Sequence, residues 1–383
     1  MKVSVLGSSG SVGGNALKAA SSLGIGIYGV SVNRDTDKLR SHIEAYKPSV
    51  AVITDSGSYR EFINDTGNDR FGTARVLCGE TGLREMTESP SSGVIVNAIS
   101  GIAGLEPTLR ALEAGKKVAT ANKESIVMGW PLIKERLSAG GELIPVDSEH
   151  SAVFQLIEGV KTGEVRKVIL TASGGAVYGK SADELRGVTP DDCLSHPTWD
   201  MGEKITVDSA TLMNKGLEII EASHLFDLGF DMLDVLIHPQ SLVHAMVEFT
   251  DGSLFAHIAP ADMRIPISYA ISHPARAELP GFSLDAADLA RLEFYTPDRK
   301  RFPCLDLAVD AGRRGGEAPV VLCAADEAAV RAFLNGSIGF TDIPGIISRT
   351  LEKGLSGSLE SSGGIIELYE RAFSAAVGFA EGK

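Results

Sequence analysis

The segment from Asp147 to His150 carries two carboxylates two residues apart, directly after the apolar run 142–146. In an extended segment, Asp147 and Glu149 face the same way and can hold one hard divalent cation. The same spacing is common on solvated surfaces, so both interpretations stay open. Ser148, Glu149 and His150 have the residue types of a hydrolase triad, but sequence neighbours rarely converge as nucleophile, base and orienter. The segment is a candidate metal site, and a hydrolase is disfavoured.

A third carboxylate and several phosphate donors lie close together near residue 214. Asn214 and Glu218 are four residues apart and share one face of a predicted helix, with Lys215 beside them and Ser209 near the helix start. Such donors can bind a phosphate, and Glu218 can be a third metal ligand. The same residue types also occur on ordinary solvated helix faces, so the geometry must decide.

The stretch 196–203 has the composition of a loop that can close over a ligand. It contains Pro197 and Gly202, and it has no apolar period that would fix it in a core. We expect a mobile lid that is ordered by a ligand, with Trp199 covering that ligand. By composition alone, Trp199 as an ordinary core residue is the commoner case.

Two further turns follow predicted strands. The turn 171–175 reads TASGG, and Ser173 with its two glycines can hold an anion, although this signal is weak by itself. The turn 121–125 reads ANKES and follows the apolar run 117–120. Open α/β sheets bind ligands at this edge, so Lys123 can meet the substrate.

A glycine-rich stretch, GSSGSVG at 7–13, lies between the first predicted strand and the first predicted helix. Backbone N–H groups in such a turn can approach a pyrophosphate. The spacing departs from G-x-G-x-x-G, so a plain βα turn fits equally well. After the second strand, where an NAD site places an acidic residue, the chain has Asn33, Arg34 and Asp35. A cation there suits the 2′-phosphate of NADPH, although Arg34 as a solvated loop residue stays open.

Strands that alternate with helices must position these residues in the first part of the chain. Apolar and β-branched runs predict strands at 2–6, 25–32, 50–54, 94–99 and 117–120. Helical spacing predicts helices that include 37–46, 106–114 and 131–138. The alternation indicates βαβ units and an α/β fold with a largely parallel, Rossmann-like sheet over residues 1–140.

The pattern changes after residue 140, and an α+β domain is expected over 141–259. Its predicted strands are 142–146, 167–171, 205–207, 235–238, 243–249 and 253–258, with a helix over 209–226. The last two strands form a hairpin whose turn is Asp251-Gly252.

The remainder divides into a connector and a helical domain. Seven of the sixteen prolines fall within residues 260–319, so 260–317 is expected to be a connector. An α-helical bundle is expected over 318–383, with helices at 321–334, 343–351 and 365–376 and with Asp342 as an N-cap.

Composition excludes several classes of protein. Lys and Arg number 36 against 50 Asp and Glu, and the net charge of −14 disfavours nucleic acid and anionic membrane surfaces as partners. No run of ~18 apolar residues predicts a membrane span, and the N-terminus lacks the apolar core of a secretion signal. The four cysteines are far apart and form no C-x-x-C pair, which predicts neither a zinc site nor a disulfide framework. We expect a cytoplasmic protein.

Taken together, these segments resemble the 1-deoxy-D-xylulose 5-phosphate reductoisomerase family along the whole chain. The motifs, in order, are GSSGSVG at 7–13, NAISGIAGL at 97–105, ATANKES at 119–125, PVDSEHSAVFQ at 145–155, LTASGG at 170–175, HPTWDMGEKITVDSATLMNKGLEIIEA at 196–222, HPQSLVHAMVEF at 238–249 and AADEAAVRAFLNGSIGFTDI at 324–343. The resemblance implies an NADPH domain, a catalytic domain that forms homodimers, a connector and a C-terminal helical bundle.

The resemblance also implies an activity. In this family NADPH and a divalent cation, Mg²⁺ or Mn²⁺ with Co²⁺ as a further candidate, convert 1-deoxy-D-xylulose 5-phosphate into 2-C-methyl-D-erythritol 4-phosphate of the non-mevalonate isoprenoid pathway. The cation acts as Lewis acid and template while the carbon skeleton rearranges by retro-aldol cleavage and re-aldolisation. NADPH then reduces the resulting aldehyde.

Roles carry over from the family to matching positions. The metal ligands match Asp147, Glu149 and Glu218. The catalytic set adds Lys123 and His196. The substrate and phosphate contacts match Lys123, Ser148, Glu149, Ser173, His196, Trp199, Ser209, Asn214, Lys215 and Glu218. The NADPH contacts match Ser9, Gly10, Ser11, Val12, Asn33, Arg34, Asp35, Asn122, Glu124, Met201 and Gly202.

Two positions depart from the commonest family pattern. A Gly-Lys-Asn run is usual where this chain has Asn33-Arg34-Asp35, so Arg34 keeps the cation while Asp35 changes the loop. Ser9 stands where Thr is usual and keeps the hydroxyl.

Two other functions are compatible with parts of the sequence. A different NADPH enzyme, such as a semialdehyde or homoserine-type dehydrogenase, gives no reason for Asp147, Glu149 and Glu218 to converge on a metal. A non-catalytic, cofactor-sensing regulator needs a basic element that reads DNA, and the sequence shows no basic run.

Overall fold

A central strand, β1 (Lys2–Leu6), leads directly into the glycine-rich turn. The computed structural model describes residues 1–195, 198–199 and 201–382. The chain forms two compact units, each with one sheet. The first unit comprises Met1–Ser125, Leu132–Ser151 and Asp262–Phe282, and the second comprises Ile126–Pro131, Ala152–Ala261 and Ser283–Lys383.

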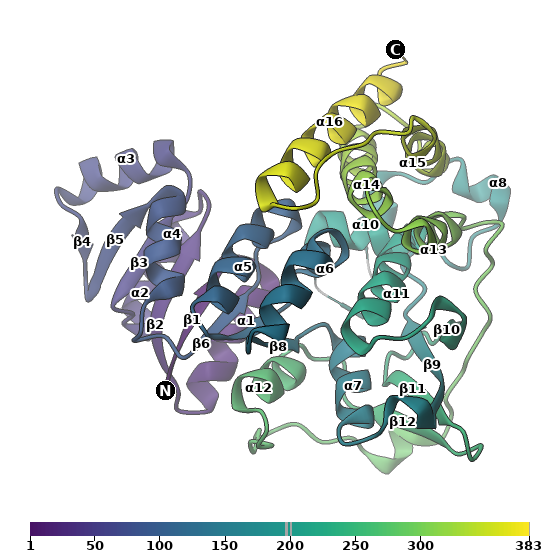
Figure 1. Cartoon of the computed structure of the whole chain (residues 1–383), viewed down its shortest axis with the longest axis horizontal. Coiled ribbons are helices and arrows are strands. Elements are labelled where there is room, and N and C mark those ends of the chain that lie inside the picture. Colours follow the sequence, from purple (N-terminus) through teal and green to yellow (C-terminus); the bar gives the residue numbers. More distant parts are fainter. Residues whose placement is uncertain (196–197, 200, 383) are drawn as a thin grey trace. The chain divides into compact units, whose positions relative to one another are not determined.

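The first unit is built on an eight-stranded sheet with the order β4-β5-β3-β2-β1-β6-β7-β8 (Figure 1). Its strands pair in parallel except β4, which is antiparallel to β5. The remaining strands are β2 (Gly26–Val32), β3 (Val50–Ile53), β4 (Arg70–Phe71), β5 (Ala74–Cys78), β6 (Val94–Asn97), β7 (Lys117–Thr120) and β8 (Glu142–Pro145). The predicted Rossmann-like α/β sheet is confirmed. The strand order reverses between β1 and β6, where such sheets bind ligands.

Helices follow most strands of this sheet. They are α1 (Ser11–Ser22), α2 (Thr36–Tyr46), α3 (Ser56–Thr66), α4 (Gly79–Glu88), the 3₁₀ turn η1 (Gly101–Gly104), α5 (Leu105–Glu113), α6 (Lys123–Ser138) and α12 (Arg264–Ser272). Because the central strands are covered on both faces, Val3, Val5, Val30 and Val96 are fully buried.

Two local predictions differ from the structure in this unit. The strand at 142–146, expected in the second domain, is β8 and pairs with β7. Its apolar pattern is that of any buried strand, so only the long-range pairing decides which sheet it joins. The helix expected at Pro131 starts at Lys123, because the Asn122 side chain accepts a hydrogen bond from the Ser125 N–H and caps it there.

The second unit contains a four-stranded sheet with the order β10-β9-β11-β12. The strands are β9 (Val165–Ala172), β10 (Leu233–Ile237), β11 (Val243–Phe249) and β12 (Leu254–Ile258). β10 runs parallel to β9, whereas β11 is antiparallel to both β9 and β12. The predicted hairpin at Asp251-Gly252 is confirmed.

Two helices, α10 (Glu203–Thr211) and α11 (Met213–Phe226), replace a predicted strand and a predicted single helix. The run 205–207, expected as a strand, lies inside α10, because its β-branched residues are buried by tertiary packing that a local pattern does not contain. The helix expected over 209–226 is broken at Leu212, which has a left-handed φ of 62°.

The C-terminal part is helical, as predicted. Its helices are α13 (Cys304–Arg314), α14 (Ala318–Leu334), α15 (Ile343–Glu352) and α16 (Ser362–Ala380). Figure 1 shows α16 packed along α14. Helices α12 and α13 lie within the stretch expected to be an irregular connector: Pro266 is in the first turn of α12 and Pro303 is the N-cap of α13, where a proline removes no intrahelical hydrogen bond.

Short helices complete the described part of the chain. They are α7 (Ser148–Ile157), α8 (Ala182–Leu185), α9 (Pro190–Leu194) and the 3₁₀ turns η2 (Thr162–Glu164), η3 (Phe230–Met232), η4 (Ala286–Leu289) and η5 (Phe340–Asp342). All four cysteines are free. Among the described helices, none combines the length and the apolar character that a membrane span needs.

Candidate functional site

The carboxyl ends of two neighbouring strands bring a lysine and an aspartate together. Lys123 is the first residue of α6, just after β7, and Asp147 follows β8. Their Nζ and Oδ2 atoms are 2.8 Å apart, and both side chains are largely buried. The edge predicted to face ligand therefore holds a buried ion pair.

The segment after Asp147 is helical rather than extended. Because α7 begins at Ser148, the expectation that Asp147 and Glu149 face the same way in a strand is wrong. The Ser148 hydroxyl donates to Glu149 Oε2 at 2.5 Å. One helical turn places His150 near Asp147, with 3.4 Å between Nδ1 and Oδ1.

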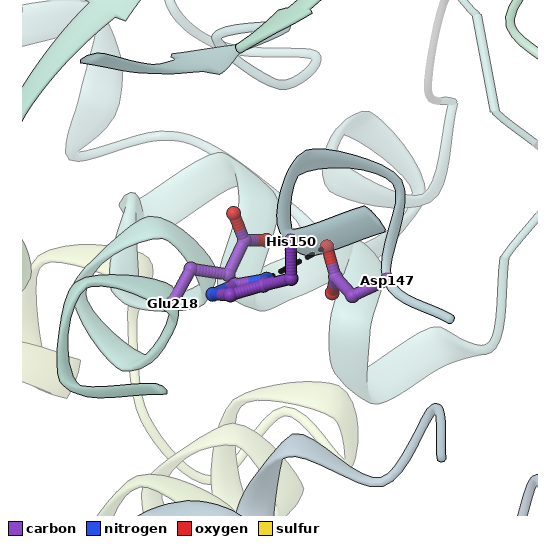
Figure 2. Close-up of side chains that lie close together, drawn as sticks. All are labelled: Asp147, His150 and Glu218. Carbon is purple, nitrogen blue, oxygen red and sulfur yellow. Dashed lines mark ion pairs between the residues drawn. The ribbon is translucent and has the colours of Figure 1, made fainter. Parts of the chain in front are cut away.

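Three side chains with metal-ligand chemistry gather at this point. One candidate ligand atom from each of Asp147, His150 and Glu218 lies within 4.8 Å of the others (Figure 2). His150 is fully buried. Sequence reasoning missed it, because His150 was considered only as a hydrolase residue; its i+3 spacing from Asp147 was the available signal.

The predicted i,i+4 pair on α11 is present. Asn214 Nδ2 donates to Glu218 Oε1 at 2.6 Å, and Lys215 forms a buried ion pair with Glu218. The two carboxylates suit Mg²⁺ or Mn²⁺, whereas the imidazole is a ligand more typical of transition metals. Lys123 and Lys215 balance the charges of the two carboxylates.

A second cluster combines the TASGG turn with the end of α10. Ser173 follows β9, and its Oγ lies 3.5 Å from Ser209 Oγ. The turn can approach the helix only because Gly175 has no side chain: a Cβ there would lie 2.7 Å from the Cα of Ala210, and its φ is +70°. Two hydroxyls beside a glycine turn suit an oxyanion such as a phosphate.

The stretch predicted to be a lid is only partly described. His196, Pro197 and Asp200 lie outside the described residues. Trp199 is half-buried, and its ring centroid lies 6.4 Å from that of His244. Burial lowers the pKa of His244 to about 4, with a further contribution from His257, so its ring is neutral at physiological pH. Gly202 is the N-cap of α10 and follows Met201.

The glycine-rich turn has the geometry of a phosphate cradle. Gly10 is the N-cap of α1, with no side chain over the helix N-terminus, and Ser11 and Val12 start the helix. A Cβ at Gly13 would lie 2.2 Å from the Gly7 carbonyl oxygen, so the turn packs tightly against the helix. These features fit a pyrophosphate at the helix N-terminus.

The loop after β2 has partners that the sequence did not reveal. Arg34 Nε forms an exposed ion pair with Asp55 Oδ2 at 3.3 Å, and the Asp35 side chain caps α2 by accepting from the Lys38 N–H. Lys38 Nζ donates to the Ser9 carbonyl at 2.9 Å. This ammonium thus lies between the two loops expected to bind NADPH, and sequence reasoning missed it, since position 38 lies inside a helix rather than in a motif.

The side chain of Asn122 is fixed by hydrogen bonds to neighbouring loops of the protein. Its Nδ2 donates to the carbonyls of Ile99 and Gly101, at 2.7 and 2.9 Å, and lies 3.2 Å from Glu124 Oε2. These bonds shape the loop after β6. Asn33 Oδ1 accepts from the Thr54 hydroxyl at 3.3 Å.

Comparisons with known proteins agree along the chain. The family model described as 1-deoxy-D-xylulose 5-phosphate reductoisomerase matches residues 3–129, that of its C-terminal domain matches 143–226, and that of the DXP reductoisomerase C-terminal domain matches 258–373.

Individual relatives are similar over almost their full length. The 1-deoxy-D-xylulose 5-phosphate reductoisomerase of Moorella thermoacetica is 46% identical over 358 residues, which cover 92% of this chain and 91% of that enzyme. The Geobacillus sp. (strain WCH70) enzyme is 42% identical over 355 residues, with 92% of both chains covered.

Solved structures are similar as well. The structure of the Zymomonas mobilis reductoisomerase in complex with NADPH has a TM-score of 0.90 and 38% identity, covering 100% of this chain and 99% of that chain. A crystal structure of DOX-P reductoisomerase in complex with NADPH, fosmidomycin and magnesium has a TM-score of 0.90 and 34% identity, covering 100% of this chain and 98% of that chain.

Proposed function

This chain belongs to the 1-deoxy-D-xylulose 5-phosphate reductoisomerase family, and we propose that the cluster of Asp147, His150 and Glu218 is the centre of its active site. The protein is an NADPH- and divalent-metal-dependent oxidoreductase that isomerises and reduces 1-deoxy-D-xylulose 5-phosphate to 2-C-methyl-D-erythritol 4-phosphate. This reaction belongs to the non-mevalonate isoprenoid pathway. The observation that supports our assignment of the centre is the convergence of two carboxylates and an imidazole in a largely buried group.

The metal is Mg²⁺ or Mn²⁺, with Co²⁺ as a further candidate, and its proposed ligands are Asp147, Glu149 and Glu218. A bound cation supplies Lewis acidity and a template for the two neighbouring oxygens of the keto-sugar. His150 orients Asp147 through the 3.4 Å contact and is a candidate fourth ligand for Mn²⁺, which accepts imidazole more readily than Mg²⁺ does.

The substrate phosphate binds the hydroxyl and ammonium donors of the second unit. Ser173, Ser209, Asn214 and Lys215 supply these donors. Because the phosphate is remote from the reacting carbons, its binding energy can orient the sugar. The other proposed substrate contacts are Lys123, Ser148, Glu149, His196, Trp199 and Glu218.

Lys123 is suited to hold a proton near the reacting oxygens. Its ammonium is buried and already 2.8 Å from Asp147 Oδ2. It can stabilise negative charge on a sugar oxygen without recruiting a group from solvent.

NADPH, which supplies the hydride, binds along the carboxyl edge of the first sheet. The pyrophosphate contacts are Ser9, Gly10, Ser11 and Val12, and the adenosine phosphate lies at Asn33, Arg34 and Asp35. Asn122 and Glu124 shape the loop beside β6, and Met201 and Gly202 approach the nicotinamide.

One assay tests the proposed function. Purified protein is mixed with NADPH, Mg²⁺ and 1-deoxy-D-xylulose 5-phosphate, and the absorbance of NADPH is followed over time. We expect oxidation of NADPH that requires both the sugar phosphate and the metal. An absence of oxidation, with a known reductoisomerase active under the same conditions, would overturn the proposal.

Arg34 and Lys38 should together select NADPH over NADH. Each can make a charge-assisted bond to the 2′-phosphate, worth about 1.5–3 kcal/mol, so Arg34→Ala and Lys38→Ala should each lower kcat/KM for NADPH by roughly tenfold to a hundredfold. The kcat/KM for NADH should stay near the wild-type value. Arg60→Ala, which removes an exposed arginine of α3, is the control. An unchanged NADPH/NADH ratio in both variants would place the determinant elsewhere.

We propose that the enzyme is a homodimer joined along β12. This strand is the edge of its sheet and exposes Leu254 by 53% and Phe255 by 55%. An exposed apolar edge strand favours pairing with another strand, and a second copy can supply its own β12 across a two-fold axis.

The charge variant Phe255→Lys should convert the dimer to a monomer, measured by analytical ultracentrifugation. The control is Leu289→Lys, which places the same charge at an exposed apolar residue outside β12. A wild-type monomer, or a Phe255→Lys dimer as stable as the wild type, would contradict this interface.

We place the enzyme in the cytoplasm, and its four free cysteines support a reducing compartment.

A further inference from the structure

Two buried carboxylates and a half-buried lysine outside the proposed ligand set form a charged group in the second unit. Lys204 Nζ lies 2.6 Å from Asp208 Oδ2 and 2.6 Å from Asp326 Oδ2. Lys204 and Asp208 belong to α10, whereas Asp326 belongs to α14 of the C-terminal helices. The lysine therefore connects α10 directly to the helical bundle.

Both carboxylates of the group are buried. Asp326 is fully buried and Asp208 nearly so, and the Lys204 ammonium pairs with both of them. Asp326 Oδ1 accepts no hydrogen bond from the described residues. Replacing such a buried charged group by well-packed apolar side chains is often neutral or stabilising, so stability is a weak explanation for these residues.

Further titratable groups lie next to Asp326. Next to Asp326, Glu327 is bonded to Arg331 and to the Tyr369 hydroxyl. Burial raises the pKa of the Cys304 thiol well above its usual range, as do the nearby Asp326 and Asp208 charges, so the thiol stays neutral.

Lys204 can position two proposed binding residues, because one lies near each end of α10. The helix begins after Gly202, proposed to contact the nicotinamide, and Ser209, proposed to bind the phosphate, follows Asp208 near its end. A helix of nine residues spans about 14 Å at 1.5 Å per residue, so one rigid element carries both contacts. Near Ser209, α10 packs tightly against the TASGG turn, because a Cβ on Gly175 would collide with the backbone of Ala210.

We infer that Lys204 is a positioning residue that fixes α10 on the C-terminal bundle and thereby sets Ser209 opposite Ser173 and Gly202 beside the cofactor. This inference rests on the proposed function of Ser209 and Gly202. It gives the C-terminal helices, to which no proposed ligand belongs, a part in substrate and cofactor binding through Asp326.

The test separates positioning from folding. Lys204→Met alone leaves two buried carboxylates without their cation, so a loss of activity in that variant could be a loss of fold. The neutral variant Lys204→Met/Asp208→Asn/Asp326→Asn removes all three charges together and should recover most of the thermal stability. Lys204→Arg keeps a cation that can bond both carboxylates. The exposed Lys353→Met on the C-terminal side of α15 is the matched control.

We expect the neutral triple variant to raise KM for 1-deoxy-D-xylulose 5-phosphate and for NADPH by roughly tenfold or more, because small displacements of binding groups have large effects. Amides of residues 203–211 should exchange hydrogen about tenfold faster than in the wild type, a readout that needs no activity. In Lys204→Arg the guanidinium can still make charge-assisted hydrogen bonds to both carboxylates. The KM values and the exchange rates of this variant should therefore lie within about threefold of the wild-type values.

A folded triple variant with wild-type KM values and wild-type exchange across 203–211 would overturn the inference. If instead the wild-type protein fails to oxidise NADPH with the sugar phosphate, the proposed function fails. The exchange rates of α10 then still decide whether Lys204 fixes the helix.

Discussion

Glu218→Gln is expected to lower kcat/KM by about a thousandfold or more, because a cation's Lewis acidity contributes several kcal/mol to the transition state and each ~1.4 kcal/mol is a factor of ten. A neutral amide is a poor ligand for a hard cation. The Gln side chain keeps the size of Glu218 and an oxygen that can accept from Asn214, but it removes the charge that pairs with Lys215, so the variant should fold with a lower thermal stability than the wild type. Steady-state kinetics over a range of Mg²⁺ concentrations measures the effect.

The matched control for this variant is Glu367→Gln, which makes the same change at an exposed residue of α16. Its kinetics should equal those of the wild type. Near-native activity of Glu218→Gln at limiting Mg²⁺ would show that Glu218 is not a metal ligand. The circular dichroism spectrum of the variant shows whether a loss of activity reflects unfolding.

Lys215→Met should change substrate and metal binding in opposite directions. The ammonium is proposed to bind the substrate phosphate, so its loss should raise KM for the sugar phosphate by roughly tenfold to a hundredfold, as expected for a charge-assisted bond of about 1.5–3 kcal/mol. The same ammonium forms the buried ion pair with Glu218. Without it, Glu218 retains more negative charge for a cation, and half-maximal activity should need less Mg²⁺.

Thermal unfolding provides a second measurement of Lys215→Met. Breaking a buried ion pair leaves an uncompensated charge and costs about 3–5 kcal/mol, so the variant should be markedly less stable than the wild type in the presence of a chelator. Mg²⁺ should then raise its Tm more than it raises the wild-type Tm, because a cation at Glu218 replaces the lost charge. If Mg²⁺ raised the Tm of both proteins equally and KM for the sugar phosphate were unchanged, Lys215 would contact neither the substrate phosphate nor the metal site.

Features encoded by neighbouring residues were predictable. The β1 strand, the glycine-rich turn and α1 follow one another within the first 22 residues, and the hairpin turn at Asp251-Gly252 is a local signal. The pairing of Asn214 with Glu218 needs only one helical turn. In each case the interacting groups are close in sequence, so local conformation suffices to bring them together.

Interactions between distant segments were decided by the tertiary structure. The sequence determined that 142–146 is a strand, but the sheet it joins depends on β7, more than twenty residues away. The run 205–207 has the residues of a strand and is a helix, because packing overrides local propensity.

The same distinction holds at the site. The sequence by itself determined the residue types and the family pattern, including the carboxylates Asp147 and Glu218. Only the fold determined that His150 lies within 4.8 Å of both, that Lys38 reaches the Ser9 carbonyl, and that Lys204 joins α10 to Asp326. The chemistry of each side chain depends only on its residue type, so it is visible in the sequence. The distance between two charged groups far apart in the sequence depends on how their segments pack, which no single segment encodes.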